Sequence, residues 1–187
     1  MPKAPDRGVA LVIVMMTMLL LTVLGAGLVL TTSAETLIAW NFRGSQQALY
    51  AADAAGEWAL VDLAAVTPDW PTLLNGSARS WFVDGVAAGK RVLADGSLLD
   101  LTAVVQQNAG WRPYAYGPLK DLLPTPPPLS PPSAFYVLVS VAPDAASASR
   151  LRVRAEAFGP RGAHKTVELG VLRDGLGVQL QSWTEVR

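Results

Sequence analysis

The dominant pattern in the sequence is an uninterrupted apolar run close to the N-terminus. No side chain from Val9 to Ala34 is charged, and Val9 to Leu30 is almost wholly apolar. As a helix rising about 1.5 Å per residue, the run to Leu30 spans about 33 Å, enough to cross a hydrocarbon core near 30 Å. Because a lone segment in lipid must satisfy its own backbone hydrogen bonds, the pattern predicts a transmembrane helix over residues 9–34.

The charges around this run predict its orientation. Lys3, Asp6 and Arg7 precede it, and the first charge after it is Glu35. Loops that carry Lys and Arg stay on the cytoplasmic side, so we expect a cytoplasmic N-terminus and an external C-terminal part. A cleaved secretory signal is an alternative, but its apolar region usually covers only about 7–15 residues.

A second helical pattern follows directly. Residues 35–66 contain no proline and are rich in residues that favour helix. Apolar positions recur at spacings near 3.6: Ile38, Phe42, Leu49, Ala52, Gly56, Ala59 and Leu63. Polar positions fall largely on other faces: Glu35, Arg43, Gln46, Asp53, Glu57 and Asp62. The pattern predicts an amphipathic stalk helix over residues 35–67, continuous with the transmembrane helix and ended by Pro68.

Beyond Pro68 the apolar period shortens to two, which predicts a β-rich head over residues 68–187. Arg150 to Ala157 alternates strictly, and Lys165 to Leu172 alternates in the same way. The residues that share one face are Leu151, Val153, Ala155 and Ala157 in the first strand and Val167, Leu169 and Val171 in the second. We expect this face to pack on the stalk helix and the opposite face to be polar.

Neighbouring segments extend these two strands into a predicted antiparallel meander. Phe135 to Val141 is apolar and β-prone, the turn residues 159–162 separate the two alternating strands, and residues 178–184 add a further strand. The fold class is therefore α+β. It consists of a long N-terminal helix, first transmembrane and then amphipathic, packed on a small antiparallel sheet.

The first half of the head carries weaker signals. Residues 80–83 predict a short strand, and Asp95-Gly96 predicts a hairpin with a type I′ turn. Residues 111–123 predict a loop with buried aromatic side chains. The proline-rich residues 124–132 predict an extended surface connection, with a docking motif for a proline-binding domain as the alternative.

Composition removes several function classes. The chain has no cysteine, which excludes disulfides, thiolate metal sites and cysteine nucleophiles. Its 15 basic residues balance its 15 acidic residues, so no net field attracts nucleic acid. His164 is the only histidine and has no evident triad partner. We therefore predict a protein that is not an enzyme and has no catalytic, metal or cofactor site.

Two charge patterns leave alternatives open. Asp53 and Glu57 stand one helical turn apart and could bind calcium or a neighbour's arginine, but a solvated helix face is the preferred interpretation. Arg150, Arg152 and Arg154 share one face of a strand. They could contact an acidic partner or DNA, or form an ordinary polar face that protects an edge.

The start of the chain resembles a type IV prepilin. Arg7-Gly8 directly precedes the apolar run, and residues 1–8 form a short basic leader. The resemblance implies that a prepilin peptidase cuts after Gly8 and that Val9 becomes the methylated first residue of the mature chain.

The stalk is similar to the N-terminal region of PilX-type pilus assembly proteins. The residues that carry this similarity are Thr32, Ser33, Glu35, Asn41, Arg43 and Asp53, the last within an alanine-rich segment. The resemblance covers about residues 7–60 and implies a pilin-like fold. The partners it implies are other major and minor pilins, the prepilin peptidase, an inner-membrane assembly platform and membrane lipid. It places the chain in a bacterial inner membrane as a single-pass protein with a periplasmic head, or in the pilus itself.

One position departs from the pattern of major pilins. Major pilins usually carry glutamate at the fifth mature position, where this chain has Ile13. The departure implies a low-copy minor pilin that helps to initiate, assemble or cap a type IV pilus. Two alternatives stay open: a minor pseudopilin of type II secretion, and an uncleaved single-span protein with a periplasmic binding domain.

Overall fold

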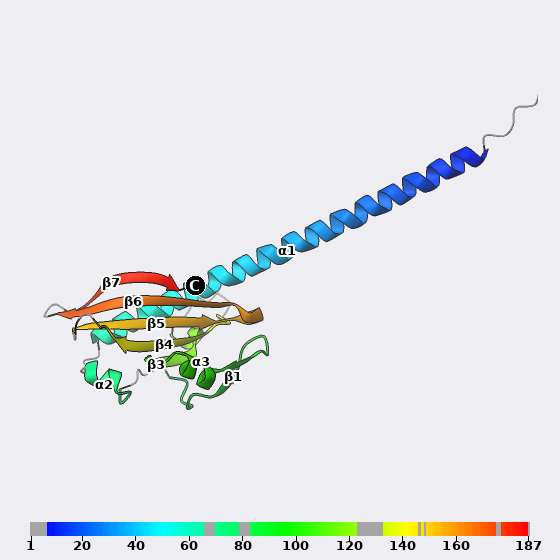
Figure 1. Cartoon of the computed structure of the whole chain (residues 1–187). Coiled ribbons are helices and arrows are strands. Elements are labelled where there is room, and N and C mark those ends of the chain that lie inside the picture. Colours follow the sequence, from blue (N-terminus) through cyan, green and yellow to red (C-terminus); the bar gives the residue numbers. More distant parts are fainter. Residues whose placement is uncertain are drawn as a thin grey trace, which may run out of the picture. The chain divides into compact units, whose positions relative to one another are not determined.

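The computed structural model describes residues 7–65, 70–78, 83–122, 133–145, 147, 149–174 and 177–186 (Figure 1). The chain divides into two compact units, Met1–Phe42 and Arg43–Arg187. In chain order the elements are α1 (Arg7–Ala65), α2 (Trp70–Leu74), β1 (Lys90–Val92), β2 (Leu98–Asp100), α3 (Leu101–Gln107), β3 (Arg112–Pro118), α4 (Leu119–Leu122), β4 (Tyr136–Pro143), β5 (Arg150–Phe158), η1 (Pro160–Gly162), β6 (His164–Asp174) and β7 (Gly177–Val186).

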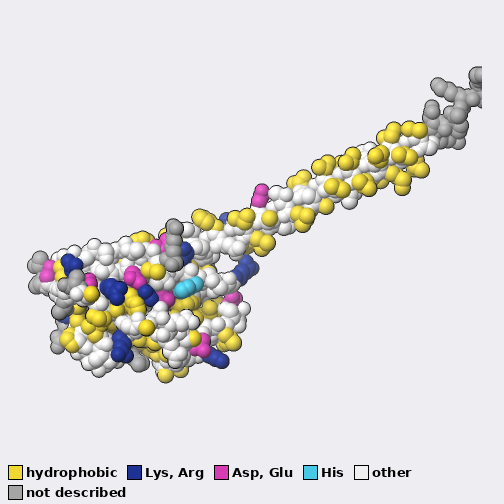
Figure 2. All heavy atoms as spheres, viewed as in Figure 1, with side chains coloured by type: hydrophobic (Ala, Val, Ile, Leu, Met, Phe, Trp, Pro, Cys, Tyr) yellow, Lys and Arg dark blue, Asp and Glu magenta, His cyan; other side chains and the backbone are white. Residues whose placement is uncertain are grey.

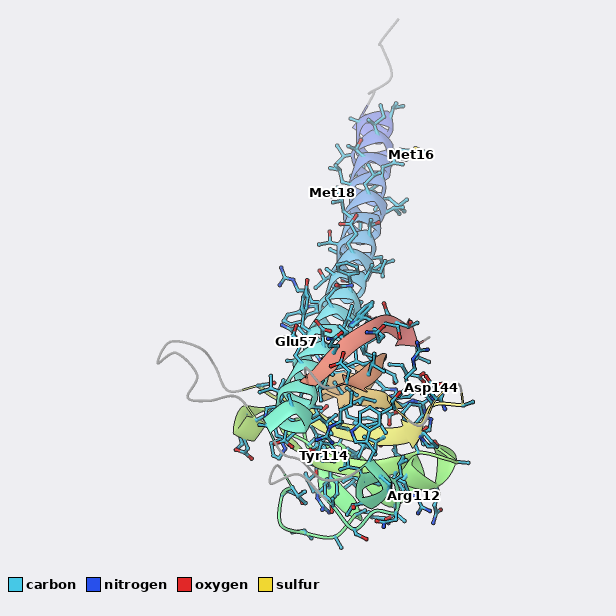
Figure 3. All side chains as sticks on the ribbon, turned by 90° about the vertical axis from the view of Figure 1, so that its left-hand side faces the viewer. Met16, Met18, Glu57, Arg112, Tyr114 and Asp144 are labelled. Atoms are coloured by element: carbon cyan, nitrogen blue, oxygen red, sulfur yellow. The ribbon has the colours of Figure 1, made fainter. Side chains whose placement is uncertain are left out.

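The first unit contains the beginning of α1, a single helix of 59 residues. The predicted continuity of the transmembrane and stalk helices is therefore confirmed. Every residue from Gly8 to Phe42 is exposed, and Figure 3 shows the side chains of Met16 and Met18 pointing away from the helix. The hydroxyls of Thr17 and Thr22 each donate a hydrogen bond of 2.8 Å to the carbonyl oxygen four residues earlier. The polar atoms of these two side chains are thus satisfied within the helix.

The second unit is built on a five-stranded antiparallel sheet in the order β3-β4-β5-β6-β7. The predicted meander is confirmed in β4 to β7, and the turn around η1 joins β5 to β6 as expected. All the predicted inward residues of β5 are fully buried, and those of β6 are at most 3 % exposed. The period of two was a reliable signal here because one face of each strand is buried throughout.

Strand β3 corrects one prediction. Residues 112–118 were expected to form part of a loop, but they pair with β4 along the edge of the sheet. Pro113, Gly117 and Pro118 hide the strand pattern in the sequence. An edge strand tolerates them because its outer backbone groups need no partner within the sheet, and the register shifts between Pro113 and Ala115. The expected burial of aromatic side chains in this region is confirmed for Trp111, Tyr114 and Tyr116.

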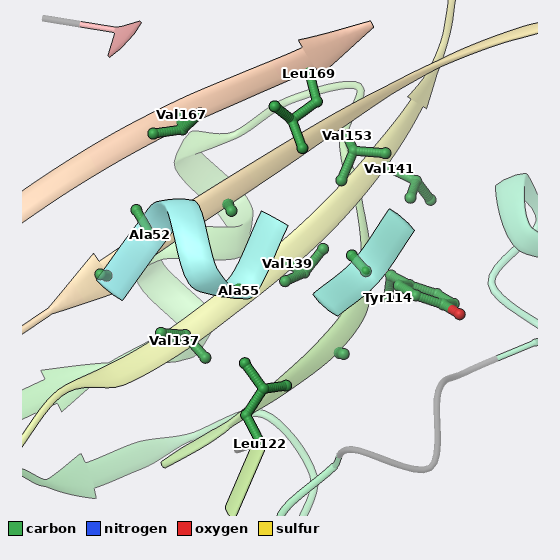
Figure 4. Close-up of a cluster of buried hydrophobic side chains, with 14 of the residues drawn as sticks. Ala52, Ala55, Tyr114, Leu122, Val137, Val139, Val141, Val153, Val167 and Leu169 are labelled. Carbon is green, nitrogen blue, oxygen red and sulfur yellow. The ribbon is translucent and has the colours of Figure 1, made fainter. Parts of the chain in front are cut away.

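The stalk part of α1 packs on one face of the sheet, which confirms the predicted α+β arrangement. Figure 4 shows Ala52 and Ala55 against side chains of the sheet such as Val139 and Val153. The buried helix face consists mainly of alanine: Ala48, Ala51, Ala52, Ala55 and Ala59. Such small side chains let the helix backbone approach the sheet closely.

The structure corrects the predicted stripe on the stalk at both ends. Ile38 and Phe42 were expected on the buried face, but both are exposed in the first unit. Asp62 was expected on a polar face and is buried, with only 6 % of its surface exposed. The prediction placed large apolar residues on the buried face of the helix, whereas the residues that pack against the sheet are mainly small.

The opposite face of the sheet was expected to be polar throughout, but part of it is apolar and covered. Beside β3 and β4 it is covered by the β1–β2 hairpin and α3, around the buried residues Leu99, Leu101, Tyr116, Tyr136 and Leu138. Only the part formed by β5 to β7 has the expected polar character. Helix α3 was not predicted, because it is short; Asp100 caps it by accepting a hydrogen bond of 3.1 Å from the Ala103 backbone amide.

The β1–β2 hairpin is confirmed, but its predicted turn type is wrong. A type I′ turn needs positive φ at both central residues, and of the Asp95-Gly96 pair only Gly96 has it, at 83°. The Gly96 amide donates to the Leu93 carbonyl, and the Leu93 amide donates to the Ser97 carbonyl. The loop therefore has three residues and ends on a glycine in the left-handed conformation.

Several predictions fall wholly or partly outside the described residues. These concern residues 1–6 of the leader, Pro68, residues 80–82 and the proline-rich residues 124–132. Val83 itself forms an isolated parallel bridge with Tyr116. Two short helices that were not predicted, α2 and α4, contribute the buried residues Trp70, Leu73, Leu119 and Leu122.

Candidate functional site

The predicted processing site lies at the beginning of helix α1. The helix starts at Arg7, so Gly8 and Val9 belong to its first turn. A side chain added at Gly8 would meet no atom within 4 Å, and Val9 is exposed. Cleavage after Gly8 remains a prediction.

Ile13 lies one helical turn beyond Val9 on an almost wholly apolar surface. It is exposed, as are the large apolar side chains around it. Its backbone carbonyl accepts the hydrogen bond of Thr17, and its side chain offers no charge to a neighbouring molecule. Figure 2 shows hydrophobic side chains along this first part of α1, in contrast to the intermixed charges on the head.

The stalk residues that carry the family resemblance play different structural parts. The hydroxyls of Thr32 and Ser33 donate to the carbonyls of Leu28 and Val29 at 2.9 and 2.8 Å, so they are satisfied inside the helix. Glu35, Asn41 and Arg43 are exposed as well, and their side chains carry charges or an amide. These three residues are available to groups outside the chain.

Asp53 has a partner within the head. Its carboxylate accepts a hydrogen bond of 2.8 Å from the indole Nε1 of Trp183 on β7. Glu57, the other member of the predicted carboxylate pair, is exposed. In the part of the chain that the structure describes, no three His, Cys, Asp or Glu side chains are grouped to hold a metal ion. The Asp53 carboxylate therefore fastens the last strand to the stalk.

A second polar contact joins the stalk to the opposite edge of the sheet. The hydroxyl of Tyr114 on β3 donates a hydrogen bond to the carboxylate of Asp62. Burial raises the pKa of the Tyr114 hydroxyl, and the hydrogen bond to Asp62 raises it further. Sequence reasoning missed this pair, although Asp62 stands three and seven residues after the buried Ala59 and Ala55 and so shares their face.

A cluster around Asp84 holds the loop before β1 against the sheet. Arg91 donates from Nε to the Asp84 carboxylate at 2.7 Å, and the Tyr136 hydroxyl donates to it at 2.7 Å. Burial alone would raise the pKa of Asp84, but the hydrogen bonds from Arg91 and Tyr136 outweigh burial and lower it. The Tyr116 hydroxyl adds a bond of 2.8 Å to the Val86 carbonyl. This cluster holds the β1–β2 hairpin on the outer face of the sheet.

The predicted arginine row is largely engaged within the head. Arg154 donates to Glu168 at 2.5 Å and to Asn108 at 2.9 Å, and its guanidinium lies 4.3 Å from the Trp111 ring. Arg152 lies over the same ring at 5.0 Å, and Arg150 is exposed. Strand β5 therefore does not present a row of free arginines that could bind DNA. These arginines form mainly the polar part of the outer face of the sheet.

His164 is exposed, as expected from the sequence. Its ring stacks on Phe158 with centroids 4.5 Å apart, and its Nε2 lies 3.6 Å from a carboxylate oxygen of Glu156. Glu156 in turn accepts a hydrogen bond of 2.8 Å from Asn108. The described partners of His164 are thus an aromatic ring and a carboxylate, and a nucleophile is not among them.

The similarity to known proteins lies in helix α1 and does not extend to the sheet of the head. Residues 7–56 match the family model described as PilX N-terminal. The chain matches no curated protein and no solved structure. The matched range begins at Arg7, includes Ile13, and ends shortly after Asp53 on the packed part of the stalk.

This match agrees with what the helix itself shows. Within the described residues, one helix is long and apolar enough to cross a membrane, and it is α1. PilX-type pilins are structural proteins that assemble with other pilins in the type IV pilus. Residues 7–56 are therefore similar to the N-terminal region of PilX-type pilins and lie on a long apolar helix, which supports a membrane-anchored protein with a pilin role related to the type IV pilus.

Proposed function

We propose that this chain is a minor pilin that helps to initiate, assemble or cap a type IV pilus. The observation that carries the proposal is the PilX N-terminal match on a helix whose first unit has no buried residue among those described. Such a surface needs lipid or other apolar helices around it. A helix of this kind can pass from the membrane into a bundle of pilin helices without exposing its apolar side chains to water.

Ile13 supports a place outside the bulk of the filament. A carboxylate buried among apolar helices costs several kcal/mol unless a positive group pairs with it, so it can specify how successive subunits align. Ile13 is the fifth residue after Gly8 and has no such requirement. A subunit with isoleucine there can take an end position, where one neighbour is missing.

The proposal includes a topology and a maturation step. Residues 1–8 form a cytoplasmic leader, the prepilin peptidase cleaves after Gly8, and Val9 is then methylated. Residues 9–34 cross the inner membrane once, and the head from residue 68 lies in the periplasm. The assembly platform of the inner membrane and the major and minor pilins are its partners. Gly25 and Gly27, where an added Cβ would meet nothing within 4 Å, allow close approach of a neighbouring helix.

Maturation is tested by the N-terminus of the chain. The full chain is expressed with and without the matching prepilin peptidase, and the N-terminal peptide is identified by mass spectrometry. We expect a peptide that begins at methylated Val9 only when the peptidase is present, and its loss in Gly8→Arg. A chain that keeps its first eight residues in both conditions would leave an uncleaved membrane anchor with a periplasmic binding head as the better account.

A further inference from the structure

The two edges of the five-stranded sheet are built differently. At the β3 edge, Pro113 and Pro118 interrupt the strand and the register shifts beside Pro113. Beyond that strand, Val83 forms a parallel bridge with Tyr116, and the Asp84 amide donates to the Tyr116 carbonyl at 3.2 Å. Prolines, bulges and a covering segment are the means by which natural sheets prevent an edge from pairing with another strand.

The β7 edge also has a register shift, opposite Gly170 and Val171, but no further strand pairs with it among the described residues. Strand β7 is 10 residues long, contains neither proline nor a basic residue, and residues 179–184 are all exposed. Its single charged side chain, Glu185, is held by the Lys165 ammonium at 2.5 Å. A long edge without an uncompensated charge is a template for a further strand.

The side of β7 that faces the stalk carries apolar side chains. Leu180 and Trp183 pair with Val171 and Leu169, whose side chains are buried under the stalk, and the register shift between these pairs keeps both on the same face. Even so, 49 % of Leu180 and 46 % of Trp183 stay exposed. The sheet thus ends in two half-covered apolar side chains rather than in a polar border.

An acidic side chain of the stalk contacts this apolar pair, and a second one follows it on the helix. Asp53 accepts the Trp183 indole hydrogen bond, and Glu57 lies one helical turn further on and is exposed. A strand added to β7 would place its stalk-side residues next to Leu180 and Trp183, on the side of the sheet where Asp53 contacts Trp183. The chemistry of this position favours apolar residues and one lysine or arginine in the added strand.

We propose that β7 is a docking edge to which a β-strand from the head of a different pilin-like subunit adds. This inference rests on the proposed function in one respect, that the partner is another membrane-anchored pilin. Main-chain hydrogen bonds would supply the binding, and the Leu180–Trp183 pair with the adjoining Asp53 would select the partner strand.

A second copy of this chain fits the edge poorly. Antiparallel pairing of β7 with itself generates a two-fold axis perpendicular to the joined sheet. Residues Ala48 to Leu63 of α1 pack along that sheet, so the axis would point two stalks in opposite directions, although both lead to the same membrane. A head-to-tail repeat would instead need the β3 edge, which is protected. A different subunit with an open edge avoids both conflicts.

Site-specific photo-crosslinking tests the edge directly. The photoreactive residue p-benzoylphenylalanine replaces Gln181 on β7 in the full chain, in native membranes that contain the other pilin-like subunits. The matched control carries it at Val92 on β1, which is also exposed. We expect the Gln181 position to give an adduct whose crosslinked peptide, identified by mass spectrometry, lies in a strand of another pilin-like head, and the Val92 position to give none.

Two leucine substitutions sharpen the result. Leu180→Lys adds a lysine of the kind that blocks natural edges, and we expect it to lower the adduct yield about tenfold. Leu98→Lys changes an exposed leucine on β2 and should leave the yield unchanged. Adducts to copies of this chain only, to proteins that are not pilins, or no adduct at Gln181 would each overturn the inference. The N-terminus is measured in the same samples: a mature chain without an adduct refutes the docking edge alone, whereas an uncleaved chain refutes the proposed function.

Discussion

The two parts of helix α1 differ in the size and the exposure of their apolar side chains. From Gly8 to Phe42 the apolar residues are mostly large, and all are exposed. From Arg43 to Ala65 the buried residues are mostly alanine, and they lie against the sheet. The first part must obtain its surroundings from outside the chain, and the second obtains them from the head. One continuous helix thus combines an assembly or membrane surface with a packing surface.

The largest difference between the two parts of α1 is expected when a charged residue is introduced into each of them. Ala55→Asp buries a carboxylate at a position with 0 % exposure, and we expect it to lower the free energy of unfolding of the head by about 4 kcal/mol or more. Ala39→Asp is the matched change at an exposed position of the first unit and should alter that free energy by less than about 0.5 kcal/mol. Urea unfolding of the full chain in detergent micelles, followed by near-UV circular dichroism, measures both. Equal effects would show that the stalk does not pack as described.

A smaller loss is expected from the buried polar contact of the stalk. Asp62→Ala leaves the Tyr114 hydroxyl buried without its acceptor, which should cost about 1–3 kcal/mol of unfolding free energy. Glu57→Ala, an exposed change one to two turns earlier, serves as the control and should be close to neutral. The same urea titration gives the difference. If Asp62→Ala were as stable as the control, the contact would contribute nothing to packing.

Two glycines of the stalk should respond to alanine with opposite signs. A Cβ at Gly56 would lie 2.9 Å from Leu169 Cδ1, whereas at Gly44 the nearest atom is Ala163 Cβ at 3.8 Å. Alanine favours helix over glycine by about 1 kcal/mol, and overpacking costs about 1–3 kcal/mol. We therefore expect Gly44→Ala to stabilise the head and Gly56→Ala to destabilise it by up to about 2 kcal/mol. A gain at both positions would argue against close packing at Gly56.

The smallest expected effect is a dependence on alkaline pH. Burial and Asp62 raise the pKa of Tyr114, and its unfolded-state pKa is about 10. Because the unfolded chain then loses the proton first, this contribution is complete below about pH 10 and decreases as the pH rises above it. Tyr136, whose pKa is also raised by burial and by Asp84, adds to the same decrease. Tyr114→Phe should make the loss of stability above pH 10 less steep than in the wild type, and an unchanged slope would contradict the assignment.

Local patterns in the sequence predicted the parts of the fold whose periodicity is unbroken. The period of two in β5 and β6 and the long apolar run of α1 are properties of neighbouring residues, and both are confirmed. Strand β3 was missed because Pro113 and Pro118 are acceptable only at an edge, which the sequence does not reveal. The buried face of the stalk was placed partly on Ile38 and Phe42 because alanine is a weak hydrophobic signal.

The candidate site divides in the same way. The residues of the family resemblance, from Arg7 to Asp53, are close in sequence, and the PilX N-terminal match covers them. The contacts of Asp53 with Trp183 and of Asp62 with Tyr114 join residues that are 130 and 52 positions apart. Such pairs depend on how the sheet lies on the stalk, so no spacing rule could have predicted them.

The central claim is that the chain acts as a minor pilin, and pilus formation in its own cells tests this most directly. Surface pili are counted by electron microscopy in cells that lack the chain and in cells that regain either the wild type or Gly8→Arg. Sheared pili are analysed for the chain by quantitative mass spectrometry. The account predicts few pili without the chain, recovery with the wild type alone, and a mature chain present in the pili at far lower abundance than the major pilin. Normal pili in cells that lack the chain, together with its retention in the membrane at full length, would contradict the account.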